Sequence, residues 1–465
     1  MSAGAIILAA GQGTRMKSAL PKVVHPLAGR PMIDWVLGAV RGAGVSEIVV
    51  VLGHEVDQVR EALRSDVAIA IQEEQNGTGH ATQVGLEALS ASCDAVVVAC
   101  GDTPLLREEH IAQLIDQHAR SGVGATMVTA VLDDAGAYGR VLRDESGAVT
   151  GVVEARDATP EQLQIREINS GLFCFDRQRL ERALGQVGSD NAQGEVYLPD
   201  TLPRMDAIGG LLVSDSSVVD GVNNRVDLAG CEQALQQRLR EELMLAGVSM
   251  PDPSSVYVDA EVEVGSDTVL MPGVYLRGAT TVGQGCVIGP NVIATDSQIE
   301  DRAQVVSAHI VDSMVGADCI VGPFSYLRPG SVLQQGAKIG TYVEVKMSSI
   351  GPGAKVPHLS YIGDAEVGAG SNIGAGNITA NYDGFRKHRT VIGERVKTGS
   401  DCVFVAPVSV GNDTMTGAGS IITDDVPDGA LAIARARQTN IEGFTARAEA
   451  KARAEAEESA QGGGS

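Results

Sequence analysis

The second half of the chain is dominated by a repeat with a period of six residues. Aliphatic side chains recur in two unbroken phases: Val264, Leu270, Leu276, Val282 and Ile288, then Val315, Val321, Leu327, Leu333, Ile339 and Val345. Glycine often follows such a position, as in Ile350-Gly351. If each hexad supplies one short strand and one turn, aliphatic residues of successive coils stack on each other. The repeat therefore predicts a solenoid of parallel β-strands over residues 251–437.

This pattern resembles the left-handed parallel β-helix of hexapeptide-repeat proteins. Just before it, residues 227–246 place Leu228, Cys231, Leu235, Leu239 and Leu243 on one helical stripe, and Gly247 can close the helix. We interpret residues 227–250 as a linker helix between two domains. The Ala/Glu/Lys/Arg-rich residues 438–465 are expected to form a frayed helix or a disordered tail.

Residues 1–226 follow a different rhythm. Short apolar segments, such as residues 48–52 and 95–99, alternate with amphipathic segments, such as residues 56–63 and 108–118. This alternation predicts a Rossmann-like α/β domain with a mainly parallel sheet that is covered by helices. Ligands of such domains bind at the carboxyl ends of the strands.

One loop of this first domain points to nucleotide chemistry. The run Leu8-Ala-Ala-Gly-Gln-Gly-Thr-Arg15 follows an apolar strand, and Lys22 lies close behind it. Gly11 and Gly13 let the backbone turn and present N–H groups to an anion, while Arg15 and Lys22 add positive charge. Met16 stands where a dinucleotide fingerprint needs glycine, and no Gly-Lys-Ser/Thr of a Walker A loop is present. The string instead resembles the signature loop of sugar-phosphate nucleotidylyltransferases.

Composition excludes several other functions. The formal net charge of −23 argues against nucleic acid or an anionic membrane as partner. The seven cysteines lack metal-site spacing, and no apolar run is long enough to cross a bilayer. We therefore expect a cytoplasmic protein with reduced thiols, whose phosphate sites are local pockets of positive charge.

Further polar segments fit a nucleotide and a sugar. Gln72 and Gly77-Thr78-Gly79-His80 suit recognition of a flat pyrimidine, although a plain loop is the alternative. Asp102 follows an apolar strand, where Mg²⁺ could sit, and Asn223 can offer a second oxygen to the metal. Gly139, Glu154 and Asn169 can form a set that binds sugar hydroxyls.

These segments occur together in the order expected for one family. The matching segments are, in order, the signature loop, Gly101-Asp102, Tyr138-Gly139-Arg140, Glu167-Ile-Asn169, Asn191-Ala-Gln-Gly-Glu195 and Gly221-Val-Asn-Asn-Arg225. In these segments the chain resembles the bacterial bifunctional N-acetylglucosamine-1-phosphate uridyltransferases/glucosamine-1-phosphate acetyltransferases. The resemblance extends to Gln438. One departure is Cys100, which stands where the family usually has tyrosine.

The resemblance implies that the first domain transfers UMP from UTP to N-acetylglucosamine 1-phosphate and releases pyrophosphate. Arg15 and Lys22 are expected to hold phosphates and Asp102 with Asn223 to hold Mg²⁺; no general base is required, because the sugar phosphate is already a nucleophile. The nucleotide and product site implied by the family comprises Leu8, Ala9, Ala10, Gly11, Lys22, Gln72, Gly77, Thr78, Cys100, Gly101, Asp102, Gly139, Glu154, Asn169 and Asn223.

The repeat domain is expected to transfer acetyl from acetyl-CoA to glucosamine 1-phosphate. An amine attacks a thioester only when neutral, so a base is needed, and His358 is the candidate, although a lone histidine in a repeat strand is often structural. The family implies that Arg328, Lys346, Tyr361 and Asn372 bind the amino-sugar phosphate. It implies that Ala375, Asn381, Tyr382, Ser400, Ala418 and Arg435 bind acetyl-CoA.

The loop from Asn381 to His388 departs from the hexad and is expected to project from the coil. The resemblance implies a homotrimer, and a projecting loop that reaches the next subunit would explain shared sites. Two alternatives remain: a nucleotidylyltransferase whose repeats only oligomerise, and a non-catalytic regulatory subunit. The set Arg15, Lys22, Asp102 and Asn223 argues against the regulatory subunit. His358 with Arg328 and Lys346 argues against the single-activity enzyme.

Overall fold

The computed structural model describes residues 2–53, 56–64, 66–189 and 191–462, and it divides into two compact units. Unit 1 spans Met1–Thr281 with Ile293–Asp296, and unit 2 spans Val282–Val292 with Ser297–Ser465. The division falls within strand β16 (Thr281–Val282). The first coils of the repeat therefore belong to the same compact unit as the α/β fold.

A nine-stranded sheet forms the centre of unit 1. Its main path has the order β11-β7-β10-β6-β1-β4-β5, and β8 and β9 branch from β10. Strand β10 runs antiparallel to β6 and β7, whereas β6, β1, β4 and β5 are mutually parallel. The strands are β1 (Ala3–Ala9), β4 (Glu47–Leu52), β5 (Ala68–Ile71), β6 (Ala95–Cys100), β7 (Ala125–Val131), β8 (Arg140–Arg143), β9 (Val149–Val153), β10 (Glu167–Asp176) and β11 (Ile208–Leu212).

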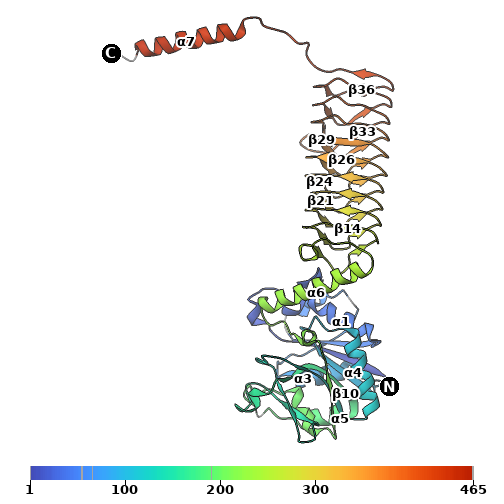
Figure 1. Cartoon of the computed structure of the whole chain (residues 1–465), viewed down its shortest axis with the longest axis vertical. Helices are drawn as coiled ribbons and strands as arrows, with labels where there is room; N and C mark the ends of the chain where they lie inside the picture. Colours follow the sequence, from blue (N-terminus) through green and yellow to red (C-terminus); the bar gives the residue numbers. More distant parts are fainter. Residues whose placement is uncertain (1, 54–55, 65, 190, 463–465) are drawn as a thin grey trace. The chain divides into compact units, whose positions relative to one another are not determined.

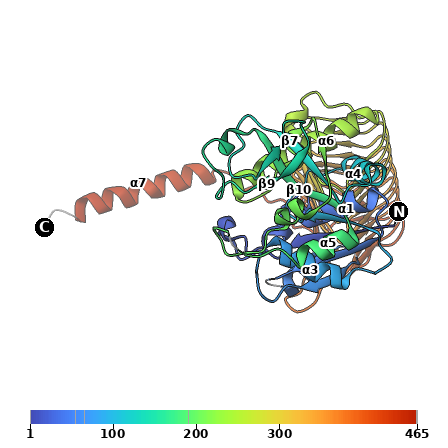
Figure 2. The ribbon, with the colours of Figure 1, turned by 90° about the horizontal axis from the view of Figure 1, so that it is seen from below.

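Alternating side chains of this sheet enter two separate cores. In β1, Ile6 packs into one core, while Ala5 and Ile7 pack into the other, as the two-residue period of a strand requires. Helices α1 (Met32–Gly42) and α4 (Glu108–Ser121) cover the Ile7 side, and α3 (Thr78–Ala88) and α5 (Arg177–Leu184) cover the Ile6 side (Figures 1 and 2). The short helix α2 (Val56–Ala62) follows β4. The α/β layering expected from the sequence is confirmed.

The linker helix α6 (Arg225–Leu245) begins two residues before the predicted start, because Asn224 caps it in a reciprocal capping box with Asp227. At its other end Gly247 has φ +99°, and the N–H of Val248 bonds the carbonyl of Leu243. The buried side of α6 meets Met16, Leu105 and Val222 in a small core with Cys231, Leu235, Leu27 and Met32. The helix is therefore packed against the segments that carry Arg15, Asp102 and Asn223.

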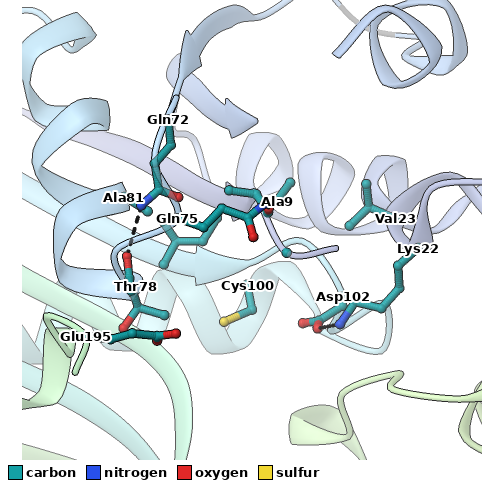
Figure 3. Close-up of a pocket in the computed structure, with 14 residues that line it drawn as sticks. Ala9, Lys22, Val23, Gln72, Gln75, Thr78, Ala81, Cys100, Asp102 and Glu195 are labelled. Atoms are coloured by element: carbon teal, nitrogen blue, oxygen red, sulfur yellow. Dashed lines mark hydrogen bonds and ion pairs between the residues drawn. The ribbon is translucent and has the colours of Figure 1, made fainter. Parts of the chain in front are cut away.

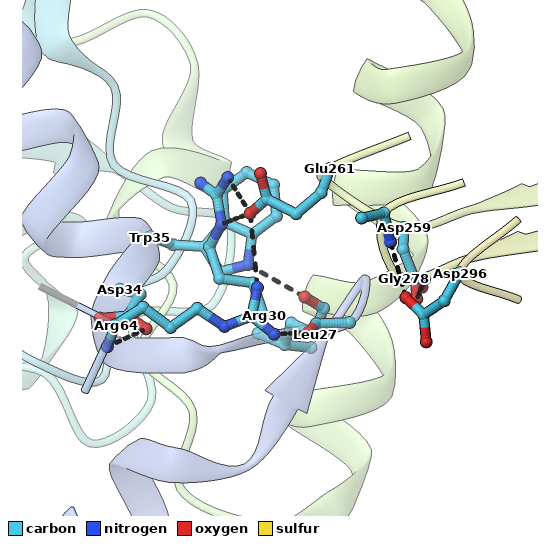
Figure 4. Close-up of polar contacts among 11 residues, drawn as sticks. Leu27, Arg30, Asp34, Trp35, Arg64, Asp259, Glu261, Gly278 and Asp296 are labelled. Atoms are coloured by element: carbon cyan, nitrogen blue, oxygen red, sulfur yellow. Dashed lines mark hydrogen bonds and ion pairs between the residues drawn. The ribbon is translucent and has the colours of Figure 1, made fainter. Parts of the chain in front are cut away.

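Helix α6 and the hairpin β2 (Pro26–Leu27) and β3 (Arg30–Pro31) also hold the first coil of the repeat. The side-chain amide of Gln236 donates to the carbonyl of Val258 at 2.8 Å and accepts its N–H at 3.0 Å. Arg30 stacks over Trp35, and both Arg30 and Arg64 bind the carboxylate of Glu261 (Figure 4). Polar contacts thus join the two kinds of fold inside unit 1.

The coils of unit 1 already show the geometry of the repeat. Strand β12 (Tyr257–Val258) pairs in parallel with β15 (Tyr275–Arg277), which pairs with β18 (Ile293–Thr295). The rings of Tyr257 and Tyr275 stack with centroids 5.0 Å apart. Strands β13 (Glu263–Val264) and β14 (Val269–Leu270) complete these first coils.

Unit 2 continues with three parallel sheets. One contains β21 (Ala308–Val311), β24 (Ser325–Leu327), β27 (Glu344–Lys346), β30 (Tyr361–Gly363), β32 (Ile378–Ala380), β34 (Val403–Val405) and β37 (Ile421–Ile422). The second contains β19 (Gln298–Ile299), β22 (Met314–Val315), β25 (Val332–Leu333), β28 (Ser349–Ile350), β31 (Ala365–Val367), β33 (Thr390–Ile392) and β35 (Val408–Val410). The third contains β17 (Val287–Ile288), β20 (Gln304–Val305), β23 (Ile320–Val321), β26 (Lys338–Thr341) and β29 (Lys355–His358), and β36 (Met415–Thr416) pairs with β38 (Leu431–Ala432).

The hexad residues lie inside these coils. Leu270, Leu276, Ile288, Val315 and Leu327 are fully buried, and Val264 is half-buried. Ile378 pairs with Val403 on a longer coil, because that coil contains the departure from the hexad at residues 381–388. The solenoid predicted from the six-residue period is confirmed.

At the end of the chain, α7 (Phe444–Gly462) is an exposed helix rather than an irregular tail; residues 463–465 lie outside the described residues. Its alanines and its Lys451–Glu455 ion pair at i,i+4 favour helix without a packed face. Within the described ranges, no helix is long and apolar enough to cross a membrane.

Candidate active sites

Two adjoining cavities lie at the carboxyl ends of β1 and β6, where the sequence predicts a ligand. The first has a volume of about 260 Å³ and the second about 250 Å³. Leu8, Thr78, Cys100 and Asp102 line both. The two cavities therefore share a border, and a ligand with two parts can extend across it.

The signature loop reaches the first cavity, and its two glycines are needed for different reasons. Gly13 has φ +60°, and a Cβ there would lie 2.7 Å from the Cβ of Lys22. Gly11 has an ordinary backbone conformation, and a Cβ there would meet nothing within 4 Å, although the residue lines the cavity. Gly13 is required by the fold, whereas Gly11 leaves space for a ligand.

The four residues predicted to hold phosphates and metal form two pairs. Lys22 forms an ion pair with Asp102 (Figure 3), and Arg15 Nη2 donates to Asn223 Oδ1 at 2.8 Å. The N–H of Val222 bonds the carbonyl of Asp102 at 2.9 Å. This backbone bond brings the Asn223 segment beside the Asp102 segment, so the structure unites residues that are far apart in the sequence.

The first cavity contains most of the predicted nucleotide contacts. Its lining includes Leu8, Ala9, Ala10, Gly11, Lys22, Gln72, Gly77, Thr78, Cys100 and Asp102. Gln72 is buried, and its amide bonds the carbonyl of Gly77 at 3.2 Å and the His80 ring at 3.0 Å. Gly77 has φ +96°, and a Cβ there would lie 2.5 Å from the carbonyl of Val196. The 77–80 segment is thus held by its neighbours as well as facing the cavity.

The second cavity collects the predicted sugar contacts Gly139, Glu154, Asn169 and Asn223. The N–H of Asn169 bonds the carbonyl of Gly139 at 2.9 Å. Burial, with Asp200 and Asp157 nearby, raises the pKa of the Glu154 carboxyl. Two predicted residues, Arg15 and Gly101, line neither cavity: Arg15 contacts Asn223, and the N–H of Gly101 bonds the carbonyl of Leu8.

Cys100 lines both cavities and therefore lies at their border. Figure 3 shows it in the lining of the first cavity. Burial, reinforced by the negative charge of Asp102, raises the pKa of its thiol to about 12. The thiol therefore stays protonated at neutral pH and acts as a small, neutral wall.

In unit 2, the residues expected to bind an amino-sugar phosphate lie on neighbouring coils. The N–H of Arg328 bonds the carbonyl of Val345, which places Arg328 beside Lys346, and Lys346 pairs in register with Gly363. A Cβ at Gly363 would lie 2.4 Å from the Tyr361 hydroxyl. This glycine therefore makes room for the tyrosine next to the two cations.

Two further contacts complete this group. Asn381 Nδ2 lies 3.5 Å from the Tyr361 hydroxyl and also bonds Asp364. Lys387, which sequence reasoning missed, has a lowered pKa because the Lys346 side chain lies next to it and the two ammonium groups repel each other. Its position in a loop outside the hexads was the only sequence signal for it.

His358 ends β29 on an exposed face, and its imidazole makes no hydrogen bond within the described part of the chain. Its carbonyl accepts the N–H of Gly376, the Ala375 carbonyl accepts the N–H of Asp401, and the Ser400 carbonyl accepts the N–H of Gly419. His358, Ala375, Ser400 and Ala418 therefore follow one another on successive coils. Asn372, exposed, pairs with Lys355 of the preceding coil, and Arg435 approaches Gly419.

Sequence reasoning missed several lining residues of unit 1. Gln75 donates to the Ala10 carbonyl at 2.7 Å and, with Glu195, lines the first cavity. Ser170 and Pro199 line the second. Glu195 lies in a segment that carried the family resemblance, but nothing in its own spacing assigned it a role.

Known proteins match both parts of the chain. Residues 5–164 match the MobA-like NTP transferase domain, and residues 261–305 match the bacterial transferase hexapeptide, with six repeats. Proteins called bifunctional protein GlmU resemble the whole chain. The one from Trichlorobacter lovleyi is 48% identical over 95% of this chain and 97% of its own length. The one from Streptomyces avermitilis is 49% identical over 96% and 94%, and the one from Pelobacter propionicus is 46% identical over 96% and 99%.

Fold and sites together define a bifunctional transferase, with a nucleotidyltransferase domain and a left-handed β-helix of hexapeptide repeats. The extent of the similarity fixes its family. The chain belongs to the bifunctional GlmU proteins and has both activities expected from the sequence, uridylyl transfer and acetyl transfer.

The two glycines of the signature loop give a matched pair of variants. We expect Gly11→Ala to leave the free energy of unfolding within about 0.5 kcal/mol of the parent, since it meets no protein atom. It should raise the KM for UTP by about tenfold, because its methyl group occupies the cavity. Gly13→Ala should lower stability, since its φ is positive and it contacts Lys22. Equal effects of both variants on unfolding and on KM would contradict this division of roles.

Proposed function

We propose that uridylyl transfer takes place at the border of the two cavities of unit 1, with UTP in the first and N-acetylglucosamine 1-phosphate in the second. One observation carries the proposal: Asp102 lines both cavities, with Lys22 on the side of the first and Asn223 on the side of the second. The positive charge of Lys22 and Arg15 is thereby concentrated where an anionic oxygen must approach a phosphate. The formal net charge of −23 makes this local concentration necessary.

The residues at this border fit Mg²⁺. Asp102 and Asn223 supply hard oxygen donors that face cationic side chains, Lys22 and Arg15. No group of three or more His, Cys, Asp or Glu suited to a metal occurs among the described residues. Two protein oxygens suit an ion that keeps water and phosphate oxygens as its other ligands. When bound, Mg²⁺ neutralises phosphate charge.

The chain's own groups need only position and neutralise. The sugar phosphate is nucleophilic at neutral pH, so no residue has to remove a proton from it. Lys22 and Arg15 can move from their acidic and amide partners to phosphate oxygens, and the protonated Cys100 adds no negative charge beside them. Gly77 and Gln72 shape the wall of the cavity for the uracil ring.

We assign acetyl transfer to unit 2. Arg328 and Lys346 would hold the phosphate of glucosamine 1-phosphate, and Tyr361 and Asn372 would hold the sugar. The line from His358 through Ala375, Ser400 and Ala418 would receive acetyl-CoA, with Arg435, Asn381 and Tyr382 as further contacts. His358 takes a proton from the amine as nitrogen attacks the thioester carbon; the C–S bond breaks, and the proton passes to the departing thiolate.

The proposed working form is a cytoplasmic homotrimer. The loop at 381–388 exposes Tyr382 and Phe385, the latter 91% exposed, although Asn381 beside them belongs to the proposed site. A neighbouring subunit would cover such side chains and complete that site. All seven cysteines are free, in keeping with a reducing compartment.

The trimer is tested by light scattering, which should give three times the mass of one chain. Phe385→Asp should shift the measured mass toward that of a monomer, with loss of acetyl transfer alone. A fully active monomer would refute shared sites.

The metal assignment is tested by Asp102→Ala. We expect uridylyl transfer to fall by at least about a hundredfold at saturating Mg²⁺, because a metal and phosphate-positioning group is lost. Acetyl transfer, measured in the same preparation, should stay near the parent value. Asp133→Ala, which removes an exposed carboxylate paired with Arg166, serves as the matched control. Normal uridylyl transfer by folded Asp102→Ala would show that this residue is not a ligand.

The base assignment is tested by His358→Ala. The single-turnover rate of acetyl transfer should fall roughly a hundred- to ten-thousand-fold, the usual contribution of a general base. Binding of glucosamine 1-phosphate should persist through Arg328 and Lys346, and higher pH should partly restore the rate as more of the amine becomes neutral. The control is His309→Ala, since His309 is an exposed imidazole that stacks on Tyr326 and has no hydrogen bond or ion pair within the part of the chain that the structure describes. Parent-like rates for His358→Ala would make His358 structural.

A further inference from the structure

A buried arginine beside the second cavity has no role in the activities described so far. Arg140, at the start of β8, is 4% exposed and forms no ion pair with a carboxylate of the described residues. Its guanidinium instead donates to three carbonyls of one turn: Ala135 at 3.3 Å, Gly136 at 3.0 Å and Tyr138. Its Nε is buried without an acceptor. Burial of a cation is costly, so we expect the turn that Arg140 holds to be important for the protein.

The turn held by Arg140 forms a wall of the second cavity. Ala137, Tyr138 and Gly139 line it, next to Glu154 and Asn169. Gly136 has φ +45°, and the N–H of Tyr138 bonds the Ala135 carbonyl at 3.1 Å, so the turn is tight. A planar guanidinium presents its donors in fixed directions, whereas the three donors of an ammonium group rotate and hold several carbonyls less rigidly. Arg140 therefore sets the position of this wall without touching the cavity itself.

Tyr138 carries the connection to the other side of the cavity. Its hydroxyl lies 3.4 Å from the Val219 carbonyl, to which it donates, and accepts the N–H of Gly221 at 3.3 Å. Two residues later, Asn223 bonds Arg15, and between them the N–H of Val222 bonds the Asp102 carbonyl. The hydroxyl thus joins the sugar-side wall to the segment with the proposed metal ligand.

We propose that Arg140 and Tyr138 are positioning residues for uridylyl transfer. Arg140 fixes the wall that receives the sugar phosphate, and the Tyr138 hydroxyl fixes that wall to the Asn223 segment. This inference rests on the proposed placement of the sugar phosphate in the second cavity and of the metal at Asp102 and Asn223. Loss of Arg140 should therefore affect the KM for the sugar phosphate, and loss of the Tyr138 hydroxyl should affect the requirement for Mg²⁺.

For Arg140, the test is Arg140→Lys in the full chain. The KM for N-acetylglucosamine 1-phosphate should rise about tenfold, while the KM for UTP changes less than about twofold, since the fork to three carbonyls is lost only on the sugar side. Arg143→Lys is the matched control: it lies on the same strand, takes the same substitution, and among the described residues hydrogen-bonds only Glu167 and the Gly147 carbonyl. Thermal unfolding and acetyl transfer report on the integrity of each preparation. Equal rises in both KM values, or parent-like values, would overturn the role of Arg140.

For Tyr138, the test is Tyr138→Phe, which keeps the ring and removes only the hydroxyl. The Mg²⁺ concentration for half-maximal uridylyl transfer should rise about threefold to tenfold, as expected for the loss of hydrogen bonds that position a ligand segment. A merely structural hydroxyl would lower the unfolding temperature and leave this concentration unchanged, and that outcome would refute the proposal. If instead Asp102→Ala kept its activity while Tyr138→Phe raised the Mg²⁺ requirement, the placement of the metal would fail and the positioning role would stand.

Discussion

The register between β1 and β6 is the constraint on which the proposed nucleotide site depends. Leu8 pairs with Cys100 in two parallel strands, and the N–H of Gly101 bonds the Leu8 carbonyl just beyond the pair. The signature loop and Asp102 therefore leave the sheet at the same place. A slip of one residue would turn every side chain of β6 to the opposite face and separate Lys22 from Asp102. Both cavities, both cation pairs and the Tyr138 connection are built around this register.

The proposed acetyl-transfer site depends on the same kind of constraint, applied coil by coil. Side chains one coil apart are brought together by parallel pairing, as with Arg328 and Lys346. The regularity of the hexad therefore determines which polar residues become neighbours. Where the hexad is interrupted, at residues 381–388, the chain leaves the coil and brings Lys387 back toward Lys346.

Much of the fold and part of the candidate sites could be predicted from the sequence, and there are physical reasons why the rest could not. Hexads, buried strands and the stripe of α6 are periodic signals, and the structure follows them closely. Many residues that line the cavities were found because a motif contained them, whereas Glu195 was missed although it lies in a matching segment. The pair of Arg15 with Asn223 arises from a tertiary contact between distant segments, which leaves no periodic trace. The turn held by Arg140 is local, but its bonds to three carbonyls follow no helix or strand period. For the tail the sequence left a frayed helix and a disordered segment open, and the structure forms the helix α7.

The two-way bond between Gln236 and Val258 changes how the chain is best divided. Gln236 is 3% exposed, and its amide satisfies both polar groups of a backbone position in the first coil. A shortened chain that ended after the linker helix would leave that amide facing solvent or an apolar gap, and would also remove Glu261 from Arg30 and Arg64. The two activities thus belong to separate parts of the sequence, but the boundary between the two compact units lies inside the solenoid. Protein engineers who wish to exchange the nucleotidyltransferase domain between family members should make the junction at the end of a coil within the solenoid.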